Sequence, residues 1–305
     1  MRTPFLYIHT GNMGNLKKIH TRYAFSFLSP WIIKLLIFWM YPLLYALYLS
    51  FTRYKALGNT TEYIGIQNYQ SIMVDPLFWK ALYNTILYTL GSVPIATFFA
   101  LFLAVLLNSK LSKFPSFYRA GLFLPSVTSI IVITLIFTNL YAKDGYINSL
   151  LQMIGLPHSE KGFLLETSTA LMSVMAMDIW LSTGYYMMLF LAGLQSIPID
   201  IYESAELQGA NAFQKLIKIT LPLLKPTLVF VLIIATIKSL QIFVEVYTMT
   251  KGGPLNSTLT VVYLIFTNAF EKTDAMGYGA ALAYVLFIVI ALFSYAQSKL
   301  VKNNG

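Results

Sequence analysis

Six long apolar stretches constrain the fold of this chain more than any other feature. They lie at residues 31–51, 82–107, 120–140, 169–194, 221–246 and 278–296. Each is close to or above the roughly 20 residues that an α-helix needs to cross the hydrocarbon core of a bilayer. A segment in that core must satisfy its backbone hydrogen bonds internally, which helices achieve. The sequence therefore predicts an all-α, polytopic membrane protein with six transmembrane helices.

The distribution of charge predicts how these helices are oriented. With 57% hydrophobic and 11% charged residues, the chain is too apolar for a soluble domain of its size. Segments predicted to lie inside carry 12 Lys and Arg against 3 acids, whereas the predicted outer segments carry 7 of each. This bias favours cytoplasmic termini, with tails at 1–23 and 301–305 and a transmembrane domain at 24–300. The net charge of +9 then reflects membrane topology and not nucleic-acid binding.

Several kinds of chemistry are excluded or disfavoured by the sequence. There is no cysteine, and the three histidines lie far apart in predicted loops, so we expect no metal site. No G-x-x-x-x-G-K-[ST] motif occurs, so no nucleotide should bind in a P-loop. An intramembrane protease lacks support because Asp178 has no second aspartate in a matching motif. A secondary transporter would show repeated halves, and none is evident. We expect a transport subunit that is not an enzyme.

The interval 199–226 is the only long polar and amphipathic interval in the second half of the chain. The spacing of Asp200 and Glu203, and again of Asn211 and Gln214, is that of a capping box. The interval should therefore form two short helices, separated by a glycine. A short amphipathic helix pair between spanning helices suits docking on a soluble partner. The alternative is an ordinary loop helix with no partner.

This interval resembles the EAA loop of permease subunits from binding-protein-dependent ABC importers, in which Glu-Ala-Ala precedes Gly-Ala and Ile-x-Leu-Pro. The matching positions are Glu203, Ala205, Leu207, Gly209, Ala210, Ile219, Leu221 and Pro222. The chain departs from the family pattern at Ser204, Gln208 and Leu216. The resemblance implies a cytoplasmic coupling loop at about 199–220. The implied ATPase-coupling residues are Glu203, Ser204, Ala205, Gln208, Gly209, Ala210, Leu221 and Pro222.

Most of the chain resembles carbohydrate-uptake permeases of the maltose, multiple-sugar and glycerol-phosphate type, as the first subunit of a pair. The strings that carry this resemblance include SPWIIKLLIFWMYPLLYALYLSF, IGIQNY, GYYMMLFLAGLQSIP, TKGGP and MGYGAALAY. It implies import of a sugar or oligosaccharide by alternating access in a bacterial or archaeal cytoplasmic membrane. A polyol or glycerol phosphate is the alternative substrate. The implied partners are a second homologous permease in a heterodimer, two ATPase subunits that bind ATP and Mg, and an extracytoplasmic solute-binding protein.

Charged residues inside the predicted spans mark a candidate site, because each costs about 2.5–3.5 kcal/mol at the centre of a membrane helix. Lys238, Gln241 and Glu245 are spaced i, i+3 and i+7, which places them on one face of a continuous helix. This polar stripe either lines a translocation path or fixes helix packing. Asp178 is the predicted counter-charge for Lys238, forming an intramembrane ion pair.

The family resemblance also implies where a solute binds. The strings at 180–186 and 238–243 fall where the maltose permease contacts its sugar at mid-membrane. Together with the polar stripe, they give the candidate solute contacts Ser182, Tyr185, Ser239, Gln241 and Glu245. The rings of Trp180 and Tyr186 suit stacking on a sugar face or ordinary packing. The turn at 252–254 is either a sharp bend at a helix end or a contact with the binding protein.

Overall fold

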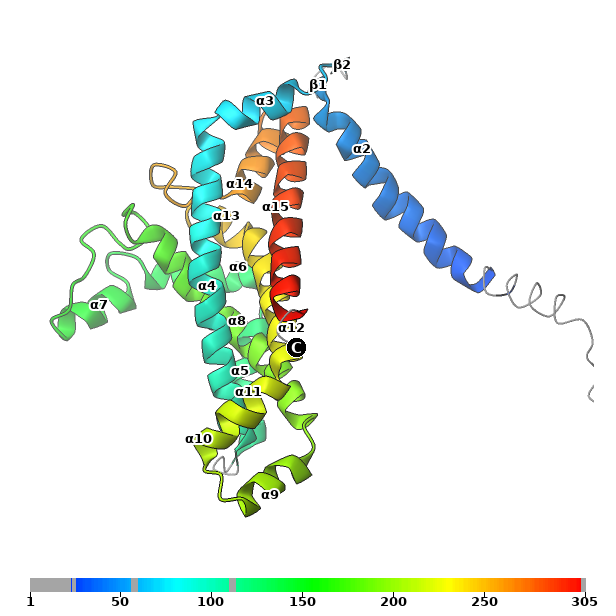
Figure 1. Cartoon of the computed structure of the whole chain (residues 1–305). Helices are drawn as coiled ribbons and strands as arrows, with labels where there is room; N and C mark the ends of the chain where they lie inside the picture. Colours follow the sequence, from blue (N-terminus) through cyan, green and yellow to red (C-terminus); the bar gives the residue numbers. More distant parts are fainter. Residues whose placement is uncertain (1–22, 24–25, 56–59, 110–113, 303–305) are drawn as a thin grey trace, which may run out of the picture.

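Long apolar helices form the body of the protein (Figure 1) in a computed structural model that describes residues 23, 26–55, 60–109 and 114–302. Within these residues, five helices are long and apolar enough to cross a membrane, and a bent helix pair is the candidate for a sixth span. The five are Ser26–Ser50, Pro76–Asn108, Ala170–Gln195, Lys225–Met249 and Met276–Lys299. The prediction of an all-α, polytopic membrane protein is therefore confirmed, with five spans and the bent pair as the candidate sixth. Much of the predicted N-terminal tail, the inner charges Lys110 and Lys113, and residues 303–305 lie outside the described part.

The elements follow the chain in a simple order. The first half contains a π-helical stretch Leu36–Met40, α2 (Tyr41–Ser50), β1 (Thr52–Lys55), β2 (Thr60–Tyr63), α3 (Gln67–Val74), α4 (Pro76–Asn108), α5 (Pro115–Val127), α6 (Ile130–Leu140) and α7 (Tyr146–Met153). The second half contains α8 (Ala170–Gln195), α9 (Ile199–Leu207), α10 (Ala212–Lys215), a π-helical stretch Leu216–Thr220, α11 (Leu221–Leu223), α12 (Lys225–Leu240), α13 (Val244–Met249), α14 (Val261–Phe266), a π-helical stretch Thr267–Glu271 and α15 (Met276–Lys302).

The third predicted span is not one straight helix. Residues 120–140 were expected to form a single helix, but α5 and α6 meet at an angle of 93°. Pro125 has no N–H to continue the helix, and Thr128 adopts an extended conformation with ψ 149°. Ser126 Oγ then donates to the backbone oxygen of Leu181 at 2.9 Å, which ties the bend to α8. The prediction of a continuous third span is therefore wrong.

A small hairpin interrupts the otherwise helical fold after the first span. Strands β1 and β2 pair antiparallel, with Thr52 opposite Tyr63. The side-chain amide of Asn68 on α3 donates to the backbone oxygens of Ser50 and Thr52 at 2.8 and 3.0 Å. These bonds fix the hairpin and α3 at one end of the bundle, opposite α9 and α10 (Figure 1).

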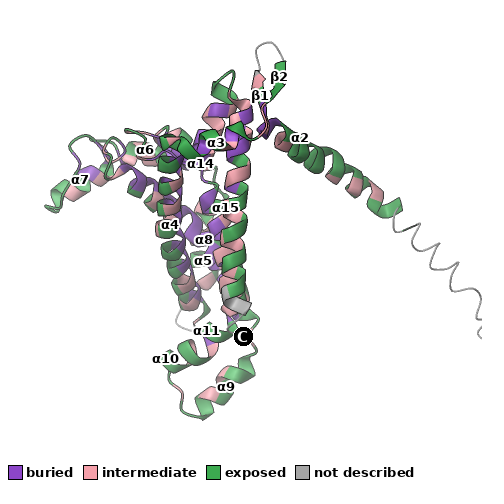
Figure 2. Cartoon of the chain, turned by 45° about the horizontal axis from the view of Figure 1, so that its top comes forward, coloured by how far each residue is buried: buried purple, intermediate pink, exposed green. Residues whose placement is uncertain are grey.

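Buried side chains gather where α4, α8, α12, α13 and α15 meet (Figure 2). The half nearer the hairpin has a core that includes Tyr88, Met177, Val246 and Leu282. The half nearer α9 has a second core that includes Ala100, Met187, Phe190 and Val231. The helix Ser26–Ser50 contributes little to either core, because 6% of its most apolar window is buried. It leaves the hairpin end and points away from the body (Figure 1).

Candidate functional site

The fifth span is broken in its second half, and this break organises the candidate site. Helix α12 ends at Leu240 and α13 begins at Val244. Gln241 has φ −100° and ψ 16°, and Phe243 has φ −142° and ψ −59°, so neither continues the helix. Irregular backbone at membrane depth is tolerated where protein or a water-filled cavity supplies its hydrogen bonds.

The break corrects the prediction of a polar stripe on one helix face. Lys238 and Gln241 are exposed, whereas Glu245 is 5% exposed. Glu245 lies in the first turn of α13 and is buried there. Thr260 Oγ1 donates to the backbone oxygen of Ile242 at 3.3 Å. Glu245 is therefore buried beside the break and does not share an open surface with Lys238 and Gln241.

A charged network joins three helices beside the break. Lys238 Nζ on α12 lies 3.2 Å from Asp178 Oδ1 on α8, and Tyr88 on α4 donates its hydroxyl to Asp178 Oδ2 at 2.8 Å. Asp178 is 7% exposed, and both of its carboxylate oxygens have a partner inside the protein. The structure thus brings together the two charges that the sequence suggested as a pair, and adds a tyrosine that the sequence reasoning missed.

Two of the predicted solute contacts use their hydroxyls within the protein. Ser239 Oγ lies 3.1 Å from Ser92 Oγ and from Thr89 Oγ1. Ser182 Oγ donates to the backbone oxygen of Asp178 at 2.7 Å. The cavity between these side chains measures about 10 Å³, room for a single water molecule. A sugar could reach these hydroxyls if α4, α8 and α12 separated.

The spacing of polar residues in the second apolar stretch could have indicated the α4 residues that the sequence reasoning missed. Asn84, Tyr88 and Ser92 recur every four residues inside the second apolar stretch, which places them on one helix face. All three are buried. A polar row on an apolar helix must face protein or water and not lipid. Applying the same reasoning to uncharged residues would have predicted that α4 contributes to the site.

The aromatic residues of α8 occupy different environments. Tyr186 is 3% exposed, which excludes it from stacking on a solute in this arrangement. Tyr185 is 43% exposed, and Trp180 is 51% exposed. The Trp180 ring packs against Phe137, with ring centroids 5.4 Å apart. Tyr185 is thus the one residue on the sequence-based list of candidate solute contacts that is both aromatic and exposed.

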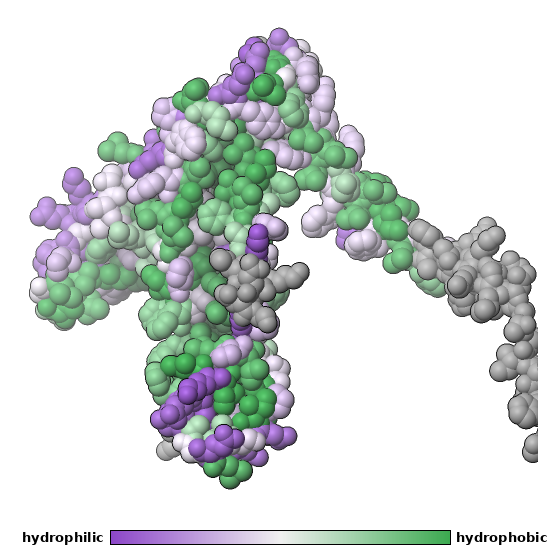
Figure 3. Space-filling view, viewed as in Figure 1, coloured by the Kyte–Doolittle hydropathy of each residue, from purple (hydrophilic) through white to green (hydrophobic). Residues whose placement is uncertain are grey.

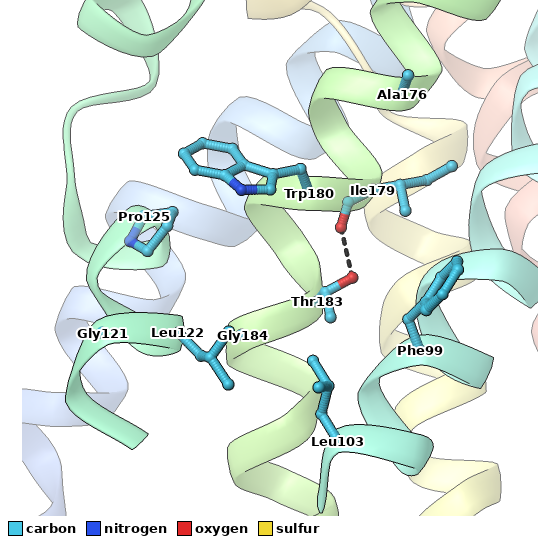
Figure 4. A pocket seen from close by; sticks show the side chains of 10 residues that line it. All are labelled: Phe99, Leu103, Gly121, Leu122, Pro125, Ala176, Ile179, Trp180, Thr183 and Gly184. Carbon is cyan, nitrogen blue, oxygen red and sulfur yellow. Dashed lines mark hydrogen bonds between the residues drawn. The ribbon is translucent and has the colours of Figure 1, made fainter. Parts of the chain in front are cut away.

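Trp180 borders an apolar groove whose lining includes neither Asp178 nor Ser182 (Figure 4). The groove has a volume of about 340 Å³ and is lined by residues of α4, α5 and α8, with Pro125 on the wall opposite the indole. Its hydroxyl group, from Thr183, already donates to the backbone oxygen of Ile179 at 2.6 Å. A groove with so few free polar groups does not suit a hydroxylated solute. The polar network around Asp178 fits such a solute better.

The predicted docking loop forms two helices, as expected, although one of its two start signals is wrong. Helix α9 begins after Pro198 with no side-chain cap, so Asp200 lies in its first turn and not at its N-cap. Proline already fixes the backbone where the chain leaves Ser196 and enters the helix. The second capping box is confirmed. Asn211 Oδ1 accepts from Gln214 N–H and Gln214 Oε1 accepts from Asn211 N–H, both at 2.9 Å.

Gly209 ends α9 in a left-handed conformation, with φ +78°. Its N–H donates to the Glu206 oxygen at 2.9 Å, and the Ala210 N–H donates to the Ala205 oxygen at 3.0 Å. This pair of bonds is a Schellman motif, which usually requires glycine at this position. An ion pair between Lys215 and Glu206 joins α10 back to α9. The glycine and the ion pair therefore fix the angle between the two helices.

The loop presents both polar and apolar side chains at the end of the molecule (Figure 3). Glu203, Ser204, Gln208, Gly209, Leu221 and Pro222 are exposed, while Ala205 and Ala210 are half-buried. Leu207 is 90% exposed, and Phe213 is 68% exposed. Exposed large apolar side chains beside exposed acids are typical of a surface that another protein covers. A cleft of about 410 Å³ lies behind α9, bordered by Glu203, Tyr202 and Thr220.

Comparison with known proteins identifies the family. Residues 73–299 match the model for binding-protein-dependent transport system inner membrane components. The chain belongs to this family. It is therefore the multi-pass membrane permease of an ABC importer, and the ATPase is a different polypeptide. Dependence on a binding protein and on an ATPase partner is a property of the family.

The permease is similar to curated sugar permeases over nearly its whole length. It is 34% identical over 290 residues to the lactose transport system permease protein of Rhizobium radiobacter, covering 94% of this chain and 97% of that protein. It is 34% identical over 279 residues to the arabinooligosaccharides transport system permease protein of Bacillus subtilis, covering 90% and 87%. The crystal structure of a bacterial ABC transporter that imports alginate matches with a TM-score of 0.76 at 23% identity, covering 95% and 99%. That similarity supports the fold.

Proposed function

We propose that this permease moves a sugar or oligosaccharide across the cytoplasmic membrane by alternating access. The observation that carries the proposal is the polar network of Tyr88, Asp178 and Lys238 beside a broken helix, deep in an apolar bundle. Discontinuous helices with polar side chains near the bilayer midplane are typical of transporter substrate sites. Similar permeases are named for the transport of lactose, arabinooligosaccharides and multiple sugars.

The charge balance of the network favours a neutral sugar over glycerol phosphate. Lys238 is paired with Asp178, and the carboxylate of Glu245 lies nearby, so two acids accompany one base. A phosphate would need an unpaired cation or a helix N-terminus. The first turn of α13 carries the acidic Glu245, which would repel a phosphate there. Glycerol phosphate is thus less compatible with the site than a neutral sugar.

The basic residues support an orientation with α9 and α10 in the cytosol. Arg119 at the start of α5, Lys215 and Lys218 near α10, Lys225 at the start of α12 and Lys299 near the end of α15 all lie toward this end of the bundle. Cytoplasmic segments are enriched in Lys and Arg. This orientation places both termini inside and the hairpin outside.

The helix Ser26–Ser50 supports a second permease subunit in a heterodimer. It contacts α15 near the hairpin, where Tyr284 donates its hydroxyl to the backbone oxygen of Leu43 at 2.6 Å. The rest of the helix is exposed, including a row of three tyrosines whose rings stack at 6.1 and 6.4 Å. A spanning helix that departs from its own bundle can pack against a homologous subunit. The transport path would then run between the two permeases.

Coupling to ATP would use the loop of α9 and α10. Two ATPase subunits, which bind ATP and Mg, would each seat such a loop in a surface cleft. The Tyr202 hydroxyl on α9 lies 3.0 Å from Thr220 Oγ1. From Thr220 the chain continues through α11 into α12. Movement of the loop can therefore be passed to α12 and to the break at Gln241 as a rigid-body shift.

The side chain of Gln241 provides the test of the substrate site. Replacing Gln241 with Ala should raise the sugar concentration for half-maximal ATPase stimulation about two- to tenfold, because a net hydrogen bond contributes about 0.5–1.5 kcal/mol. The assay would use the complete importer in lipid vesicles with its binding protein. Gln152→Ala, which removes an exposed amide on α7, is the matched control and should not change the curve. Identical curves for both variants would show that Gln241 serves packing alone.

A further inference from the structure

The apolar groove beside Trp180 lies within the membrane-spanning part of the protein, toward α9. Its walls belong to α4, α5 and α8. Leu103, on the α4 wall, lies about 7.5 Å along the helix axis from the last residue of α4, Asn108, at 1.5 Å per residue. Asn108 in turn borders the cleft behind α9. The groove therefore occupies the half of the bundle that ends at α9 and α10.

The groove is open, and it is too small for a helix of another subunit. Phe99 and Trp180, which line it, are 47% and 51% exposed. A Cβ added at Gly121 on the α5 wall would meet no atom within 4 Å, so the space beside this residue is unfilled. One turn of an α-helix with its side chains, about 10–12 Å across and 5.4 Å long, occupies roughly 400–600 Å³. The groove has about 340 Å³, which suits a narrower apolar group.

A cation without a counter-charge lies beside the end of the groove nearer α9. Arg119 precedes the groove residue Leu122 by three positions, which makes the two neighbours on the surface of α5. The Nε of Arg119 is buried and has no hydrogen-bond partner, and the ion pairs in the described part of the chain do not involve this residue. Helical side chains lean toward the N-terminus of their helix, which here is the direction of α9. Since burying an unpaired charge is costly, this position favours an anionic ligand.

We propose that the groove and Arg119 form a binding site for an anionic phospholipid, with one acyl chain in the groove and the phosphate at Arg119. The inference rests on the orientation given under the proposed function, which places Arg119 at the cytoplasmic leaflet, and it does not depend on the identity of the sugar. Anionic lipids are found in that leaflet, and basic pockets between spanning helices on that side bind their headgroups. The planar guanidinium of arginine matches the geometry of a phosphate.

The α5 residues that line the groove give the bound lipid a structural consequence. Pro125 forms the wall opposite Trp180 (Figure 4), and α5 ends two residues later, at the bend toward α6. An acyl chain in the groove would contact α4, α5 and α8 together. The lipid would therefore support the bent third span from the side that its own contacts with α8 leave open.

Filling the groove from Gly121 tests the acyl-chain part of the site. The complete importer, extracted in mild detergent, would be incubated with equal amounts of phosphatidylglycerol and phosphatidylcholine, and the retained lipid would be counted by native mass spectrometry. Gly121→Leu should lower the retention of both lipids about tenfold, as for the loss of about two buried methylene groups. Ala120→Leu adds the same side chain at an exposed α5 position outside the groove and should retain lipid like wild type.

Removing the charge of Arg119 tests the headgroup part of the site in the same assay. The wild type should prefer phosphatidylglycerol about fivefold, the contribution of one basic residue near an anionic headgroup. Arg119→Gln should lose this preference and keep its retention of phosphatidylcholine. Lys299→Gln removes an exposed cation near the end of α15 and should keep the wild-type preference.

A photoreactive amino acid at position 121 identifies the occupant of the groove directly, and it should cross-link to phosphatidylglycerol. Cross-linking to the second permease would overturn the proposal, and so would equal retention of lipid by Gly121→Leu and Ala120→Leu. A preference for phosphatidylglycerol that survives in Arg119→Gln would exclude Arg119 as the headgroup contact. A wild-type importer that takes up sugar but retains neither lipid would overturn the lipid site and leave the proposed function intact.

Discussion

Replacing Gly209 with Val should abolish ATP-coupled uptake while leaving membrane insertion intact. Gly209 has φ +78°, a conformation that costs a residue with a Cβ about 1–2 kcal/mol and a β-branched residue more. An added Cβ meets no atom within 4 Å, so the main cost is expected in the backbone and not in a clash. Relaxing that backbone breaks the Schellman bonds and changes the angle between α9 and α10. Uptake of radiolabelled sugar into ATP-loaded vesicles measures the loss, and the amount of membrane-inserted protein measures insertion.

Gly155 offers a matched control for this substitution. It also has a left-handed backbone, with φ +71°, and no atom lies near its missing Cβ. It follows α7, far along the chain from the docking loop. Gly155→Val should therefore carry a similar backbone cost with uptake close to wild type. Gly209→Asn should keep part of the activity, because asparagine tolerates this conformation. Normal transport by Gly209→Val would show that the shape of the loop is not needed for coupling.

The spans were predictable because the length of an apolar stretch is a local property of the sequence. The position of a helix break, in contrast, is not a local property of the sequence. The break at Gln241 contains neither proline nor glycine, and Thr260 from beyond the next turn donates a hydrogen bond to the backbone oxygen of Ile242 within it. The bend between α5 and α6 has a local signal in Pro125, but its 93° angle depends on contacts with α8. Packing between distant segments therefore decides where the spans bend.

The site was partly predictable for a related reason. A charge in hydrocarbon must find a partner, and the described spans contain few candidates, so Asp178 was a natural choice for Lys238. The uncharged polar residues of α4 cost less to bury than charged residues do, so their spacing is a weaker signal of a site. The start of α9 shows the opposite error. The spacing of Asp200 and Glu203 fits a capping box, but Pro198 starts the helix two residues earlier.

Replacing Lys238 with Met should destabilise the permease strongly, because it leaves Asp178 buried without its cation. Removing one partner of a buried ion pair typically costs about 3–5 kcal/mol. The Lys238 side chain is 47% exposed, which favours the lower end of this range. Tyr88 would still donate to Asp178 Oδ2, but a neutral donor does not replace the charge. The loss should appear as a lower melting temperature of the detergent-solubilised protein and as reduced sugar uptake.

The double variant Asp178→Asn with Lys238→Met separates the pair from a direct role of either residue. If the two side chains mainly neutralise each other, the double variant should recover much of the stability that Lys238→Met loses, since no unpaired charge remains. Recovery of stability without recovery of uptake would assign the network a role in transport as well. Lys161→Met, at an exposed lysine in the segment between α7 and α8, is the control and should change neither quantity. Additive losses in the double variant would contradict the coupling between Asp178 and Lys238, and the charges would then act independently in the folded permease.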